Sequence, residues 1–493
     1  MFKSFIVINL IFLFLSGNTV AQNTWGHLAN EDFADSVIKS TLFFTGNWRN
    51  GVQFYDYNPS NNTGLYTQHP SDSRHLGWSE NVAYRNFAVN TIIDAGINVI
   101  NFSYWGLPGT DNWAYWAPMQ TSTQSHDELF DAVLGKPVLV APFIESFAET
   151  NDFDGFSFMD DFPGTSVNPA PQLVELIEDL VNRYIISPDN PSWTEKWARV
   201  YDKDEDERYL ISIIHVASNK PGVTDQEFAE GFDLVANKVY NDTEIKVGFA
   251  LDILPPATFA PGSFKATPDN TGPHLLSQSS VLAVQCFIPE IWKGISNETT
   301  LIEWKEDFFS GWINSGIPFI HDVNSGYDAH IVFPSSPVYG NNQTWRDLQE
   351  SLITELGVEA LAFNAWNGYT EGIVGVPTLQ HIDTTYLWVC NLFGGTCGEN
   401  PSSVITWSDN QNFIIFPNPA QDYIRIIFPK NVTDIINLSV CSITNQLMIS
   451  KNITKSKDID YFELDINNLP CGIYTVSVIN QENIYSKKFE VLH

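Results

Sequence analysis

The chain has 493 residues and a formal net charge of −33, although only 17% of its residues are charged. Such an acidic surface repels nucleic acid and anionic membranes, so we expect no nucleic-acid partner. After the N-terminus, no segment offers the roughly 20 uninterrupted apolar residues of a membrane-spanning helix, which predicts no transmembrane segment.

The first 21 residues have the pattern of a secretory signal. Lys3 precedes an apolar run from Phe5 to Leu15, and small residues follow as far as Ala21. The run is too short to span a bilayer, and the small residues suit a cleavage site. The sequence therefore predicts a signal peptide over residues 1–21 and an exported mature protein.

Residues 22–397 alternate short β-branched runs with longer amphipathic ones. Several strand-like runs follow a glycine, which suits a left-handed helix end before a buried strand. Near-continuous apolar strands joined by helical crossovers are typical of a parallel sheet, and eight such units favour an α/β fold of the (β/α)8 TIM barrel type. The candidate strands lie at 41–46, 97–106, 136–145, 208–217, 245–254, 281–290, 317–324 and 358–367, with helix-like stretches at 79–96, 170–185, 225–240 and 344–357.

Motifs for nucleotide cofactors and metals do not occur. The chain lacks a glycine-rich phosphate loop and an H-E-x-x-H motif, so we expect no cofactor and no metal site. The acidic run 202–207 starts like a calcium loop but lacks its glycine and its final glutamate, which favours a solvated turn.

From residue 412 onward the sequence changes to short alternating strands separated by turn residues, which predicts a small β-sandwich over 412–493 behind a polar linker at 398–411. Its motifs "FPNPAQDYIRI", "LPCGIYTVSV" and "KKFEVL" resemble the sorting domain of type IX secretion in Bacteroidota. The resemblance implies that the type IX machinery is a partner. It also implies export across the outer membrane, followed by release or attachment at the cell surface.

The five cysteines of an exported chain allow at most two disulfides. Cys390 and Cys397 are close enough in sequence to close a loop. Cys441 and Cys471 lie further on, and spacing alone leaves their pairing open.

Polar and aromatic residues recur where the predicted strands end, which is where barrel enzymes build their active sites. Converging carboxylates with aromatic walls suit the hydrolysis of glycosidic bonds, because acids serve the chemistry and aromatic faces cover sugar rings. A helix cap or a salt bridge remains the alternative for any one acid, Glu145 and Asp252 above all. The candidate catalytic acids are Glu371, Glu290, Asp252 and Glu145, and the candidate sugar-binding residues are Tyr104, Trp105, Trp113, His215, Asp322, Trp366, Asn367 and Tyr369.

The segment "FNAWNGYTEG" (363–372) resembles the W-N-E-W-x-E-G motif of glycoside hydrolase family 99. Trp366, Asn367, Glu371 and Gly372 match, and Tyr369 stands where the second Trp is expected. The resemblance implies that Glu371 is the general acid/base. The first Glu of the motif falls on Gly368, so that part of the family's mechanism has no counterpart here.

The wider region 40–395, with "YNPSNNTGLYTQHPSDSRH" and "NFSYWGLPGTDNWAYWAPM", resembles secreted barrel proteins of domain of unknown function 5010, which are grouped with glycoside hydrolases without a proven substrate. The sequence thus predicts an exported glycoside hydrolase acting on a carbohydrate. Glu371 is its acid/base, Glu290 its partner, and Asp252 and Glu145 are the reserves. The alternative is a surface glycan-binding protein on a barrel scaffold that lacks catalysis.

Overall fold

The chain divides into two compact units, Met1–Ser403 and Val404–His493, which are described separately. The proposed signal peptide lies outside the described residues. In the described part of the chain, no helix is long and apolar enough to cross a membrane. The structure, a computed structural model, describes residues 24–45, 68, 70, 75, 78, 82–104, 123–145, 161–214, 222–255, 264–293, 297–330, 335–369, 371–378, 381, 384–397, 414–416, 420–427, 434–442, 447–455, 461–480 and 483–492.

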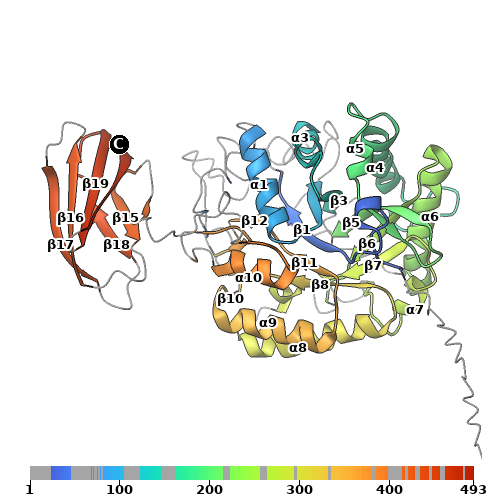
Figure 1. Cartoon of the computed structure of the whole chain (residues 1–493). Coiled ribbons are helices and arrows are strands. Elements are labelled where there is room, and N and C mark those ends of the chain that lie inside the picture. The colour runs from blue at the N-terminus through green and yellow to red at the C-terminus, as the bar shows by residue number, and fades with distance from the viewer. Residues whose placement is uncertain are drawn as a thin grey trace, which may run out of the picture. The chain divides into compact units, whose positions relative to one another are not determined.

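The first unit is a closed barrel of eight parallel strands, which confirms the predicted TIM barrel (Figure 1). The strand order is β3-β2-β1-β11-β8-β7-β6-β5, and β3 pairs with β5 to close the ring. Each strand overlaps one of the eight predicted runs. The strands are β1 (Lys39–Phe43), β2 (Val99–Tyr104), β3 (Leu139–Glu145), β5 (Glu207–Ile214), β6 (Val247–Asp252), β7 (Val281–Gln285), β8 (Phe319–Val323) and β11 (Leu361–Phe363), with β4 (Arg199–Tyr201) antiparallel to β5.

Helices surround this barrel in Figure 1. Helix α6 begins with a capping box in which Thr224 and Glu227 satisfy each other's backbone N–H groups. The four glycines predicted to end helices before strands all have positive φ: Gly96, Gly135, Gly316 and Gly357. The helices are α1 (Val82–Asp94), α3 (Thr123–Val133), α4 (Pro171–Val181), α5 (Trp193–Lys196), α6 (Asp225–Thr243), α7 (Gly272–Leu275), α8 (Glu298–Asn314), α9 (Gln343–Leu356) and α10 (Thr384–Phe393), with the short helices η1 (Glu31–Phe33), η4 (Asn182–Ile186) and η6 (Pro289–Lys293).

The barrel interior is apolar at its base. Leu28 and Val200 form a β-bridge there and pack with inward residues of the barrel strands. A second apolar cluster of Leu42, Phe143 and Ile214 comes from β1, β3 and β5. The carboxyl-terminal ends of β6 and β8 instead bring buried acids, so the end of the barrel that follows the strands, here called the mouth, carries its polar residues.

Two small hairpins extend the mouth. Strands β9 (Gly326–Asp328) and β10 (Val338–Gly340) follow β8, and strands β12 (Asn367–Gly368) and β13 (Ile373–Val374) follow β11. The sequence predicted one strand as far as residue 367. The buried strand β11 ends at Phe363, and the chain then turns into the second hairpin.

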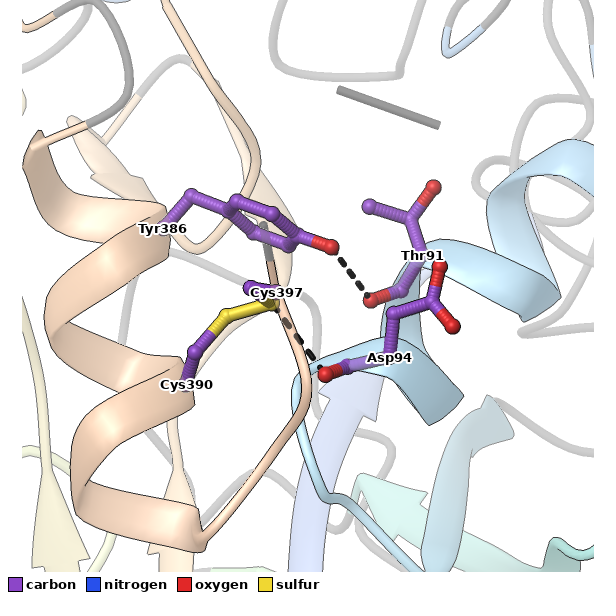
Figure 2. Close-up of a disulfide and its surroundings, with 5 residues drawn as sticks. All are labelled: Thr91, Asp94, Tyr386, Cys390 and Cys397. Carbon is purple, nitrogen blue, oxygen red and sulfur yellow. Dashed lines mark hydrogen bonds between the residues drawn. A yellow bond between two sulfur atoms is a disulfide. The ribbon is translucent and has the colours of Figure 1, made fainter. Parts of the chain in front are cut away.

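A disulfide joins Cys390 of α10 to Cys397, as the spacing predicted (Figure 2). Cys397 Sγ lies 3.2 Å from the carbonyl oxygen of Asp94, at the end of α1. The hydroxyl of Tyr386, also on α10, donates to the carbonyl oxygen of Thr91 at 3.4 Å. These contacts hold α10 against α1 beside the barrel.

The second unit contains two antiparallel sheets, as predicted for its fold class. One sheet has the order β14-β15-β18 and the other the order β17-β16-β19-β20, and their apolar faces form one core. The suggested Cys441–Cys471 pairing stays a prediction, because the Cys441 side chain lies outside the described part. The strands are β14 (Ile414–Phe416), β15 (Tyr423–Ile427), β16 (Asp434–Ser442), β17 (Leu447–Lys455), β18 (Tyr461–Asp465), β19 (Gly472–Asn480) and β20 (Asn483–Val491).

Candidate active site

Glu371 lies at the tip of the β12–β13 hairpin and remains partly exposed. Its backbone carbonyl accepts the N–H of Asp328 at 2.8 Å. The hydroxyl of Tyr327, on β9, donates to Glu371 Oε1 over 3.4 Å. Both the backbone and the side chain of this acid are therefore held by the neighbouring hairpin.

Further hydrogen bonds join the two hairpins. The hydroxyl of Ser325 accepts the N–H of Val374 at 3.2 Å, and Asn341 Nδ2 donates to the carbonyl oxygen of Gly372 at 3.3 Å. Gly372 has a φ of +69°, and an added Cβ would come within 3.3 Å of Asp328. A glycine after Glu371 thus lets the hairpin tip approach β9 closely.

The carboxyl group of Glu371 has a pKa closer to neutral pH than that of a free glutamate. Burial raises the pKa of its carboxyl to about 7, and the hydrogen bond from Tyr327 acts in the opposite direction. A carboxyl group with a pKa near the working pH can both give and take a proton. The geometry therefore allows Glu371 to act as an acid and as a base.

A second group of charges is enclosed beside the mouth. The Nζ of Lys305, on α8, lies 2.5 Å from Glu290 Oε1 and 3.2 Å from Asp322 Oδ2, and all three side chains are at most 1% exposed. Asn324 Nδ2 donates to Asp322 Oδ2 at 3.1 Å, and Asn364 Nδ2 donates to Asp322 Oδ1 at 3.0 Å. We call these five residues the buried charge cluster.

The cluster keeps its lysine charged. Burial alone lowers the pKa of Lys305, but the carboxylates of Glu290 and Asp322 outweigh it and the net shift is upward. Burial raises the pKa of Glu290, against the attraction of Lys305. Burial therefore makes Glu290 harder to ionise than a free glutamate, while the ammonium group of Lys305 favours its ionised form.

Two buried acids, Asp322 of this cluster and Asp252 at the end of β6, also hold the chain segment between β7 and η6. Asp252 Oδ1 accepts the N–H of Phe287 at 2.5 Å, and Asp322 Oδ1 accepts the N–H of Ile288 at 3.1 Å. Asp252 is 0% exposed. The sequence left open a structural, cap-like role for Asp252, and in the structure this side chain does bind a backbone N–H group.

Tyr339, on β10, lies near both Glu371 and the acids of the buried charge cluster. Burial raises the pKa of its phenol, and the nearby charges of Glu290, Asp322 and Glu371 raise it further. The phenol is thus within electrostatic reach of both Glu371 and the buried charge cluster. Its ring stacks on that of Tyr327, with the centroids 6.2 Å apart.

Three residues of the "FNAWNGYTEG" segment serve the packing of the barrel. Asn367 Oδ1 accepts the N–H of Phe44 at 3.0 Å, and its Nδ2 donates to the carbonyl of the same residue at 3.1 Å. Trp366 is fully buried against Phe363 and Tyr386, and Tyr369 is 2% exposed. The described contacts of these side chains thus differ from the sugar-binding surface that the sequence predicted.

Tyr104 also faces away from the mouth. Its ring packs 5.5 Å from that of His126 on α3, and its pKa is raised by burial and by Asp179 of α4. It therefore belongs to the layer between the barrel and its helices. Trp105, Trp113 and His215 lie outside the described residues, and of Glu145 the structure describes only its place as the last residue of β3.

The sequence interpretation missed Lys305 and Tyr327. Lys305 occupies the apolar stripe of α8, between Leu301 and Phe309, and a lysine in such a stripe is a signal for a buried ion pair. Tyr327 follows β8 in a three-residue strand whose sequence shows no periodicity. No comparable signal marks it.

Comparisons with known proteins identify the second unit and report resemblances for the first. Residues 414–491 match the family described as the secretion system C-terminal sorting domain. A search of curated proteins finds no match. Similar solved structures include the GH99 endo-α-mannosidase from Bacteroides thetaiotaomicron, at 15% identity over 72% of this chain and 96% of that chain, with a TM-score of 0.45.

Two others are an endo-β-1,4-mannanase double mutant from Cellulomonas fimi and a GH5-4 broad-specificity endoglucanase from Ruminococcus champanellensis. The mannanase is 9% identical over 80% of this chain and 86% of its own, with a TM-score of 0.36. The endoglucanase is 10% identical over 69% of this chain and 92% of its own, with a TM-score of 0.37. Likeness at this level carries no information about substrate or catalysis.

Proposed function

We propose that the protein is an exported glycoside hydrolase in which Glu371 is the general acid/base. The observation that carries the proposal is Glu371 itself, a partly exposed acid at the mouth of a TIM barrel with a pKa raised to about 7. TIM-barrel enzymes place their active sites at this end of the strands. The C-terminal sorting domain supports the export of the chain.

In the proposed reaction, protonated Glu371 gives its proton to the glycosidic oxygen as the bond from that oxygen to the anomeric carbon breaks. Water then adds to the anomeric carbon and loses a proton to a carboxylate. Because the hydroxyl of Tyr327 donates to Glu371 Oε1, the transferable proton is carried by the other carboxyl oxygen, Oε2.

A second carboxylate is required to stabilise or attack the anomeric carbon. Glu290 and Asp252 are 0% exposed, and Glu290 is bound to Lys305. We therefore place Glu145, at the carboxyl end of β3, first among the proposed partners of Glu371. The sequence interpretation had ranked Glu290 first.

Replacing Glu371 with Gln tests the proposal. We expect the rate on a natural glycan to fall roughly 10²–10⁴-fold, because the leaving oxygen loses its proton donor. On an aryl glycoside with a good leaving group, such as dinitrophenolate, the loss should be much smaller, since that group departs without protonation. Reducing-sugar release and phenolate absorbance measure the two rates on the substrates that wild type cleaves in a polysaccharide panel.

The matched control is Glu350→Gln on the exposed face of α9, which should keep both rates. Full activity of the Glu371→Gln variant on a glycan would contradict the proposal. A wild-type protein that binds glycans in affinity electrophoresis but releases no product would favour the glycan-binding alternative. The observation that favours this second function is the burial of Glu290 and Asp252, because a buried acid does not reach a bound sugar.

A further inference from the structure

Tyr327 is the described side chain that touches the carboxyl group of the proposed acid. Its hydroxyl donates to Glu371 Oε1 at 3.4 Å, and the N–H of the next residue, Asp328, binds the Glu371 carbonyl at 2.8 Å. Catalytic hydrogen bonds are often long in unliganded enzymes and tighten when substrate binds. Two consecutive residues of β9 thus hold both ends of Glu371.

The ring of Tyr327 has little freedom to move. It is 5% exposed and packs in a core with Ile288, Leu301 and Ile373. It also stacks on Tyr339 at an interplanar angle of 20°. Since a packed ring has few rotamers, its hydroxyl occupies a fixed position before any substrate arrives.

The hydrogen bond reaches one oxygen of the acid. The phenol of Tyr327 donates to Glu371 Oε1. A donor on one carboxyl oxygen leaves the proton on the other.

We propose that Tyr327 is the positioning residue for Glu371, fixing which carboxyl oxygen carries the proton and where that oxygen points. The inference rests on the proposed role of Glu371. It assigns the geometry of the site to the β9–β10 hairpin as well as to the hairpin that carries the acid.

The test compares Tyr327→Phe with Tyr339→Phe, two changes that remove only a hydroxyl from the same stacked pair. Loss of the Tyr327 hydroxyl removes a bond that favours ionised Glu371, so the pKa of the acid rises. A general acid works only while protonated, so activity falls as pH rises through its pKa. We expect the alkaline limb of kcat/KM to move up by roughly half a unit to one unit in Tyr327→Phe.

The rate at the optimum should also fall about tenfold on poor leaving groups, because the proton is no longer held on the productive oxygen. The Tyr339→Phe variant should keep the wild-type pH profile. A substrate-free readout is the labelling of Glu371 by a water-soluble carbodiimide, which reacts with protonated carboxyl groups. Peptide mass spectrometry across pH should show the same upward shift in Tyr327→Phe alone.

An unchanged or downward-shifted limb and labelling curve in Tyr327→Phe would overturn the positioning role. If Glu371→Gln keeps full activity, the proposed function fails instead, and the carbodiimide curves still decide whether Tyr327 governs the Glu371 carboxyl. The two failures are therefore distinguishable.

Discussion

At the residue scale, Lys305 explains how the carboxyl groups of Glu290 and Asp322 can be buried. Its stem continues the apolar stripe of α8, while its ammonium group meets Glu290 and Asp322. An enclosed charge is tolerated only when it is paired and hydrogen-bonded. The lysine thus connects α8 to η6 and β8, next to the segment that Asp252 also holds.

Replacing Lys305 with Met should destabilise the barrel strongly, because Glu290 and Asp322 would face each other without a cation. We expect the free energy of unfolding to fall by about 3–5 kcal/mol. Of the 15 Trp residues, 14 belong to Met1–Ser403, so Trp fluorescence during urea unfolding reports mainly on the first unit.

The control is Lys246→Met, which removes the ion pair with Asp206 between side chains that are 41% and 52% exposed. This exposed pair should contribute about 1 kcal/mol or less. The deficit of Lys305→Met should grow as pH rises through the acidic range, since the raised pKa of Glu290 rises further without the lysine. A loss below 1 kcal/mol at neutral pH would show that the cluster is not a stabilising contact.

At the element scale, the eight barrel strands could be predicted because a strand buried on both faces is a near-continuous apolar run, as in 97–106 and 136–145. The hairpins at the mouth could not. Strands of two or three residues such as Asn367–Gly368 are too short to show a period, and side-chain hydrogen bonds between hairpins set their position. Glu371 was therefore predicted from its motif, whereas Tyr327 was not predicted.

The same limit applies to individual side chains. The sequence places Trp366 and Asn367 at the end of a strand. In the structure that strand ends at Phe363, and both side chains are buried in the packing of the barrel. Tyr104 ends β2 on the face that meets α3. Which face a terminal residue presents depends on the register of the closed barrel, and a single sequence does not specify that register.

The α10–α1 contact gives a prediction for the disulfide drawn in Figure 2. Cys390 and Cys397 enclose a loop of eight residues, and removing the bond with a Cys390→Ser/Cys397→Ser double variant frees that loop in the unfolded chain. The loop-entropy relation gives a loss of about 2.5 kcal/mol in the free energy of unfolding. Chemical denaturation of the double variant and of reduced wild type should give equal losses, and a stability unchanged from oxidised wild type would contradict the argument.

At the scale of the whole molecule, the negative charge belongs to the first unit. Residues 412–493 carry eight acids and seven Lys or Arg residues, so nearly all of the net charge of −33 precedes them. The segment 146–170, which follows β3 in the chain, carries five acids and no Lys or Arg. In the buried charge cluster, the one cation is already bound to two carboxyl groups.

This charge balance should make the proposed enzyme select neutral glycans. A uronate-containing polysaccharide meets repulsion from the acidic first unit, whereas its carboxyl-reduced form has the same linkages and no charge. We expect kcat/KM on the reduced form to be at least about tenfold higher at low salt, a difference of roughly 1.4 kcal/mol in the free energy of the transition state relative to free enzyme and substrate. Raising the salt from about 0.01 M to 1 M shortens the screening length from about 30 Å to 3 Å, so most of the difference should disappear. A preference for the acidic polymer, or a tenfold difference that persists in high salt, would show that a local cationic subsite governs recognition.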